Sequence, residues 1–130
     1  MRGLHAKRLL GPIIGLVLAS TGCAALLLVG GAGTGAVAFA TGELRVTEEA
    51  TLTELQEATR RATDTLRYLD VEVVVEADRV LWTATTAGGD PVDIRLIAVS
   101  PERTEVRIRI GVFGSEPRSR LVLEEIRRAL

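Results

Sequence analysis

The stretch EVRIRI at residues 105–110 alternates charged side chains with Val106, Ile108 and Ile110. A period of two predicts a strand with one apolar face, which other parts of the chain have to cover. Residues 92–96 show the same alternation, so we expect the two segments to pair with their apolar sides together. This pairing requires a loop with an odd number of residues or a bulge, and we expect a three-residue loop at residues 101–103.

Upstream of this pair, residues 71–76 and 80–85 also alternate apolar and polar side chains. They are expected to form half-buried strands, with Trp82 in the core. The chain reverses at Asp78-Arg79 and again at Gly88-Gly89-Asp90, both of which are typical turn sequences. A further short strand is expected at residues 43–46.

Two segments have the period of an amphipathic helix. Between residues 51 and 69 apolar side chains recur at steps of three and four, and Thr51 with Glu54 fits a capping box. The second helix runs to residue 130 and has Pro117 in its first turn, while Phe113 is expected to fill the junction between the sheet and this helix. The order β-α-β-β-β-β-α predicts an α+β, two-layer sandwich, a mostly antiparallel sheet with two helices on one face.

The N-terminal third has the features of a lipoprotein signal. Residues 1–8 are basic, residues 9–42 carry no charge, and the run Ser20-Thr21-Gly22-Cys23 resembles a lipobox, although Ser20 stands where Leu is commoner. We expect residues 1–22 to be a signal peptide, cleaved between Gly22 and Cys23, with lipid on Cys23. Alternatively, Cys23 is a small apolar residue inside an uncleaved membrane anchor.

Residues 23–42 form a Gly/Ala-rich apolar segment between the lipidated cysteine and a soluble domain of residues 43–130. One interpretation is a flexible linker. In another, Gly31 and Gly35 provide the small-xxx-small spacing that lets helices associate in a bilayer, so that a single-span membrane protein forms a homo-oligomer.

The residue types argue against an enzyme. The only histidine, His5, lies in the signal peptide, and the sole cysteine is committed to lipid, so we expect no catalytic residues, no metal site and no cofactor. After cleavage, 13 basic residues would face 17 acidic ones, a net charge of −4 that argues against a nucleic-acid partner. One alternative is an anionic-ligand binding module that uses Arg95, Arg107 and Arg109 on the sheet face opposite the helices.

Two parts of the chain resemble a known family. The run TEVRIRIGVFGSE at residues 104–116, followed by Arg118-Ser119 and residues 123–130, looks like the end of a family of short bacterial lipoproteins known as domain of unknown function 3568. Gly42-Glu43-Leu44 after the lipobox is also similar to that family's pattern. The resemblance implies a location and a fold class, and it implies no substrate or catalytic residue.

The predicted function is that of a cell-envelope lipoprotein, held in the membrane by lipid (diacylglycerol and palmitate-type acyl chains) on Cys23. Ala24 in place of Asp after the cysteine suggests the outer membrane, facing the periplasm, if the host has two membranes. The soluble domain is expected to be a non-catalytic structural or interaction module with another envelope protein as partner.

Overall fold

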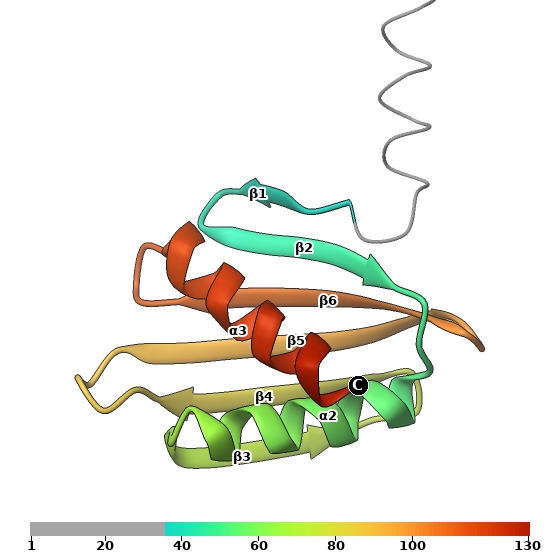
Figure 1. Ribbon diagram of the computed structural model, residues 1–130, viewed down its shortest axis with the longest axis horizontal. Coiled ribbons are helices and arrows are strands. Elements are labelled where there is room, and N and C mark those ends of the chain that lie inside the picture. Colours follow the sequence, from blue (N-terminus) through green and yellow to red (C-terminus); the bar gives the residue numbers. More distant parts are fainter. Residues whose placement is uncertain (1–35) are drawn as a thin grey trace, which may run out of the picture.

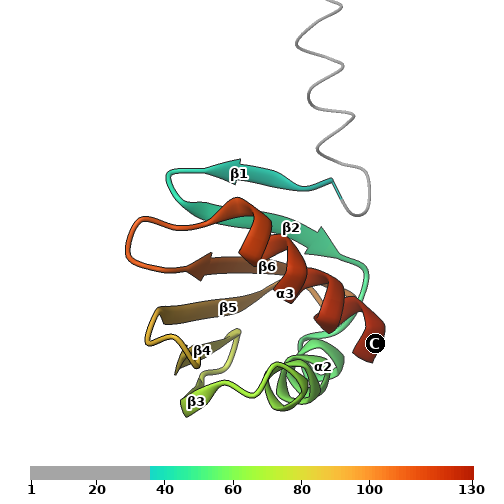
Figure 2. The same cartoon turned by 60° about the vertical axis from the view of Figure 1, so that its left-hand side comes forward.

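The computed structural model describes residues 36–130, which form a six-stranded antiparallel sheet with two helices on one face (Figures 1 and 2). In chain order the elements are β1 (Ala38–Ala40), β2 (Glu43–Glu48), α2 (Leu52–Thr65), β3 (Leu69–Val75), β4 (Arg79–Thr85), β5 (Pro91–Ser100), β6 (Arg103–Ile110) and α3 (Glu116–Ala129). The predicted α+β class is confirmed. The predicted signal peptide, with Gly22 and Cys23, lies outside the described residues.

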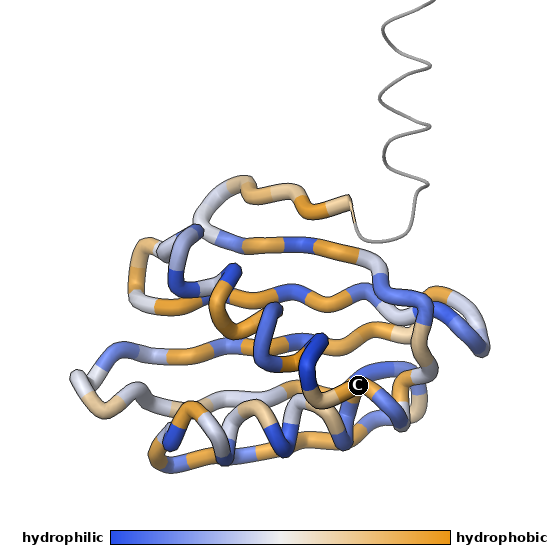
Figure 3. Tube along the Cα trace, viewed as in Figure 1, coloured by the Kyte–Doolittle hydropathy of each residue, from blue (hydrophilic) through white to orange (hydrophobic). Residues whose placement is uncertain are grey.

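The centre of the sheet is the predicted pair of strands. In the sheet order β1-β2-β6-β5-β4-β3, Ile94 on β5 lies opposite Ile108 on β6, and Leu96 lies opposite Val106. All four side chains are fully buried under the helices. The alternation of hydrophobic and hydrophilic residues along both strands is visible in Figure 3. The prediction that the apolar faces of these two strands lie together is therefore confirmed.

The connection between β5 and β6 differs from the predicted three-residue loop. Ser100 pairs with Arg103, which leaves a two-residue turn at residues 101–102, and the register shifts between Ala98 and Ser100. The extra residue is absorbed by this bulge in β5, so the apolar faces stay aligned. The prediction of a loop at residues 101–103 was wrong, and the bulge is the other solution that face matching allows.

The observed strand order begins one strand earlier than predicted. β1 pairs with β2 through a tight turn in which Thr41 and Gly42 both have positive φ, 52° and 78°. Two consecutive positive φ values are typical of the two-residue turns that match the twist of a hairpin. The last part of the predicted Gly/Ala-rich segment is thus a strand, and the order is β-β-α-β-β-β-β-α.

The first helix begins as predicted and ends earlier. The Thr51 side chain accepts a hydrogen bond from the Glu54 N–H, and the Glu54 carboxylate accepts one from the Thr51 N–H, which completes the capping box. Its end follows from Arg67, whose φ of 54° is left-handed, while the Tyr68 N–H donates to the Thr63 carbonyl. Leu69 therefore starts β3 and is not on the helix.

The helices cover only part of the sheet. α2 packs on β4, β5 and β6, and α3 packs on β2, β6 and α2. β3 lies at the edge, and all seven of its residues are exposed, so the expectation that this strand is half-buried was wrong. Lateral position decides burial here, because β3 has the same β-branched composition as the covered strands.

The loop before α3 also differs from its predicted role. Phe113 is 91% exposed, so it does not fill the junction between the sheet and the last helix. This junction is closed by backbone, since a Cβ atom added to Gly114 would overlap the carbonyl oxygen of Gly42. No space remains for an aromatic ring, and the ring points outward. Pro117 does lie in the first turn of α3, as predicted.

Candidate functional site

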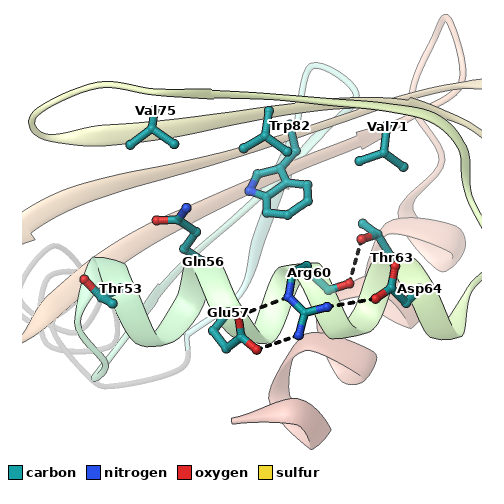
Figure 4. Close-up of a pocket in the computed structure, with 10 residues that line it drawn as sticks. Thr53, Gln56, Glu57, Arg60, Thr63, Asp64, Val71, Val75 and Trp82 are labelled. Atoms are coloured by element: carbon teal, nitrogen blue, oxygen red, sulfur yellow. Dashed lines mark hydrogen bonds and ion pairs between the residues drawn. The ribbon is translucent and has the colours of Figure 1, made fainter.

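A groove of about 550 Å³ lies between α2 and β3, where the helix does not cover the edge of the sheet. Its apolar side consists of Val71, Val73 and Val75 from β3 and Trp82 from β4. Because the period of a strand is two, the three valines point to the same face of the sheet as the core. Figure 4 shows Val71, Val75 and the Trp82 ring opposite the polar side chains of α2.

The other side of the groove is polar and is formed by one face of α2. Gln56 and Thr53 lie near the start of the helix, followed by an ion-paired set centred on Arg60. Arg60 Nη2 donates to Glu57 Oε1 at 2.7 Å, and Arg60 Nη1 donates to Asp64 Oδ2 at 3.1 Å. The hydrogen bond from Arg60 holds the pKa of the Glu57 carboxyl below its ordinary value. The helix thus presents a charged wall in which one arginine is paired with two carboxylates.

Trp82 is the most unusual side chain of the groove. Only 4% of its surface is exposed, which confirms its predicted place in the core. Its indole Nε1 is nevertheless buried without a hydrogen-bond acceptor. Buried indole N–H groups normally have a partner, because a donor that has lost water and gained nothing destabilises the fold. The ring therefore packs like a core residue and keeps one donor unused beside an open groove.

The comparison with protein families is decisive for the chain as a whole. The family described as protein of unknown function (DUF3568) matches residues 8–129. The chain belongs to this family. The match includes both walls of the groove, and it confirms the resemblance found in residues 104–116 and at Gly42-Glu43-Leu44. No curated protein is significantly similar to this DUF3568 chain.

The three arginines predicted as an anionic-ligand face do lie together on the uncovered side of the sheet. Arg95 and Arg107 are register partners on adjacent strands, and Arg109 is opposite Asp93. Each guanidinium already has a partner: Arg95 Nη2 lies 3.2 Å from Glu43 Oε2, Arg107 pairs with Glu105, and Arg109 Nη2 donates to the Thr41 carbonyl at 2.8 Å. These contacts offset the repulsion between neighbouring arginines.

Glu43 is a buried acid that the sequence analysis did not single out. It is 4% exposed and accepts a hydrogen bond at 2.8 Å from Arg45 Nε besides its ion pair with Arg95. A carboxylate that loses most of its water is stable only when charged donors replace the water. Two of the three arginines are thus paired with acids on the same face and the third with a backbone carbonyl. Anion binding there stays a prediction.

The groove itself was also missed. The signal that could have indicated it is the run Val73-Val74-Val75, which is apolar on both faces of a strand and is preceded by Asp70 and Glu72. Alternation alone could not show that this strand lies at the edge, next to a helix that stops short of it.

Two other site predictions concern metals and membranes. Within residues 36–130 no group of three or more histidine, cysteine, aspartate or glutamate side chains is placed to hold a metal ion. In the same part of the chain no helix is long and apolar enough to span a membrane. Cys23 and Gly22, as well as Gly31 and Gly35, lie outside the described residues, so lipidation, cleavage and self-association through this segment stay predictions.

Proposed function

We propose that this chain is a lipid-anchored protein of the bacterial cell envelope whose α+β domain works by binding another envelope protein, without catalysis. The anchor is lipid on Cys23, and the binding surface is the groove between α2 and β3. In a host with two membranes, the domain faces the periplasm from the outer membrane. The proposal combines a sequence signal at the N-terminus with a structural feature of the folded domain.

The observation that carries the binding role is the unused donor of Trp82. A groove with four apolar side chains on one wall and polar groups on the other has the composition of a recognition site. An acceptor from a bound partner would give Trp82 Nε1 the hydrogen bond that it lacks in the free domain. The sequence supports binding over catalysis, because the mature chain would contain no histidine and its only thiol would carry lipid.

The anchor is tested by mass spectrometry of the protein purified from membranes of its host. We expect the mature N-terminus at Cys23 with a diacylglycerol mass on its sulfur, and we expect Cys23→Ser to release the protein from the membrane. An intact Met1, or an unmodified Cys23 at the N-terminus, would overturn lipid anchoring.

The binding role is tested with a photo-crosslinking side chain at Gln56 in the living host. We expect an adduct with one identified envelope protein, reproducible between cultures. A crosslinker at Glu124, an exposed position on α3, is the matched control and should not give this adduct. If both positions give the same adducts, or if Gln56 gives none, the groove is not the binding surface.

A further inference from the structure

β3 is an open edge of the sheet, and its backbone shows which groups are unused. Glu76 N donates to the Arg79 carbonyl at 2.9 Å, which fixes the phase of the ladder between β3 and β4. In an antiparallel pair only alternate residues direct their N–H and C=O groups to the neighbouring strand. Val74 and Glu72 therefore direct their backbone N–H and C=O groups to β4, while Val73 and Val75 direct theirs away from the sheet.

We propose that β3 receives an extended, basic segment of a partner polypeptide, which adds to the sheet as a seventh strand and places a side chain in the groove between α2 and β3. This inference rests on the proposed function and specifies the partner of the same site. The main chain of the segment forms hydrogen bonds with the backbone of Val73 and Val75, whose side chains also belong to the apolar side of the groove. One edge thus offers both backbone pairing and side-chain recognition.

The charge of the edge determines the chemistry of the partner. β3 contains Asp70 and Glu72 and no basic residue, and Glu76 follows directly. Of these three acids only Glu76 has an ion pair within residues 36–130, at 3.5 Å from Arg79. Lysine or arginine on an added strand would face these carboxylates across the new ladder, where opposite charges stabilise and like charges destabilise.

The same charges argue against a second copy of this chain as the occupant. If two β3 strands paired antiparallel about Val73, Asp70 of one copy would lie opposite Glu76 of the other. An acyl chain fits the valines but satisfies neither the free backbone groups nor the carboxylates. A basic polypeptide segment can bond to the free backbone groups, contact the valines and pair with the carboxylates.

Trp82 adds one requirement on the side chain that enters the groove. Its Nε1 is a donor only, so the entering group has to bring an acceptor, such as the amide oxygen of glutamine. Figure 4 shows the indole ring between the β3 valines and α2, so a side chain in the groove would meet it. The preferred segment therefore alternates basic residues with residues that face the groove, one of which carries an amide.

The first experiment uses the fluorescence of Trp82, the only tryptophan of the chain. The full-length protein in phosphatidylcholine vesicles is titrated with a capped seven-residue peptide, the length of β3, that alternates valine and lysine. We expect a saturable change in emission that weakens as salt is added. The matched control peptide alternates valine and glutamate and should bind at least about tenfold more weakly. Equal binding of both peptides would overturn the proposal.

The second experiment removes a backbone donor from the edge. Val73→Pro deletes an N–H that points away from β4, which an edge strand tolerates, and should abolish peptide binding. Val73→Thr keeps the donor and the branched shape and should bind normally. Circular dichroism of both variants checks the fold. If Val73→Pro is folded and binds like the parent protein, strand addition is excluded.

A charge variant keeps the test valid if Val73→Pro does not fold. Glu72→Lys leaves the backbone unchanged and should weaken binding of the lysine peptide about tenfold and strengthen binding of the glutamate peptide. Unchanged affinities for both peptides would contradict the proposal.

The third experiment tests the acceptor. A peptide with glutamine at its central position should bind more tightly by calorimetry than one with methionine, and this difference should disappear in Trp82→Phe. An equal difference in both proteins would show that Trp82 Nε1 is not the donor, and would overturn this part of the proposal.

A second copy of the chain or an acyl ligand at β3 would give different experimental results. Dimerisation that Val73→Pro abolishes, without binding of the lysine peptide, would show a second copy at β3 and overturn the proposal. A Trp82 response to free fatty acid but not to peptide would overturn it in favour of an acyl ligand. Failure of strand addition remains distinct from failure of the proposed function, because a Gln56 adduct that persists in folded Val73→Pro keeps the partner and removes only its binding mode.

Discussion

β6 and β3 are built from similar residues and have opposite environments. Val106, Ile108 and Ile110 on β6 are at most 1% exposed, whereas Val73 and Val75 on β3 are 40% and 60% exposed. The sequence pattern predicts a strand for both segments, and both are strands in the structure. The difference comes from lateral position, since β6 lies between β2 and β5 under both helices and β3 lies at the edge. β-branched side chains therefore specify a strand here, and helix placement determines whether they become core or an exposed edge.

The largest expected difference between β6 and β3 is in the stability lost when a side chain is shortened. Ile108→Ala removes a fully buried side chain and should lower the free energy of unfolding by about 2–5 kcal/mol. Val73→Ala on β3 is the control and should cost less than about 1 kcal/mol, because its side chain already contacts water. Chemical denaturation measures both. Equal losses would mean that β3 is covered in solution.

A second pair compares glycines in the packed and open parts of the molecule. Gly114→Ala should lower the free energy of unfolding by roughly 2–4 kcal/mol, since its φ is 83° and the new Cβ would overlap the backbone of Gly42. Gly89→Ala has a similar φ, 91°, but meets nothing within 4 Å, so only the left-handed backbone costs about 1 kcal/mol. A smaller loss at position 114 than at position 89 would refute the close approach of the two glycines.

A third pair of variants compares a buried threonine with an exposed one. Thr104 on β6 is fully buried, and its Oγ1 donates to the Ala50 carbonyl at 2.9 Å, which ties the sheet to the start of α2. Thr104→Val should cost about 1–2 kcal/mol, because the carbonyl loses its donor. Thr83→Val, at an exposed position beside β3, should change stability by no more than about 0.5 kcal/mol. Thermal unfolding of both variants measures the two losses, and an equal loss at both positions would contradict the prediction.

The smallest expected effect concerns the pH dependence of α2. Hydrogen bonds from the Thr51 N–H and hydroxyl hold the pKa of Glu54 below its ordinary value in the folded protein. A lowered folded-state pKa stabilises the protein above the unfolded pKa, and this contribution disappears as the pH falls through the folded value. Glu54→Gln should therefore flatten the acid side of the stability curve slightly. Identical curves for both proteins would show that the capping box contributes no pH dependence.

Local patterns predicted the parts of the fold whose outcome is local. Alternation predicted that the apolar faces of β5 and β6 lie together, and the Thr51–Glu54 spacing predicted the start of α2. The errors depend on tertiary position. β1 was hidden in a Gly/Ala-rich run, because a strand of three residues has too little sequence for a visible period. Phe113 was assigned to a junction that two glycine backbones already close.

The candidate site was less predictable than the fold. Trp82 was correctly placed in the core from its size and its alternation with Thr83. The missing hydrogen bond of its indole N–H could not be predicted, because it depends on how α2 packs against the sheet, which the alternation within one strand does not show. The arginine face was predicted on the correct side of the sheet, but not its buried acid, Glu43, which lies across two strand pairings from Arg95.

The strand order has a mechanical consequence. β1, where the described chain begins, and β3 are the two opposite edges of one sheet. A pull between the proposed lipid anchor, on the β1 side, and the proposed partner at β3 would act across the strands, along the direction of the hydrogen bonds that join them. Under such a load the ladders are strained one pair at a time rather than sheared together. The short β1–β2 ladder at one edge would then open before the long β5–β6 ladder in the middle of the sheet.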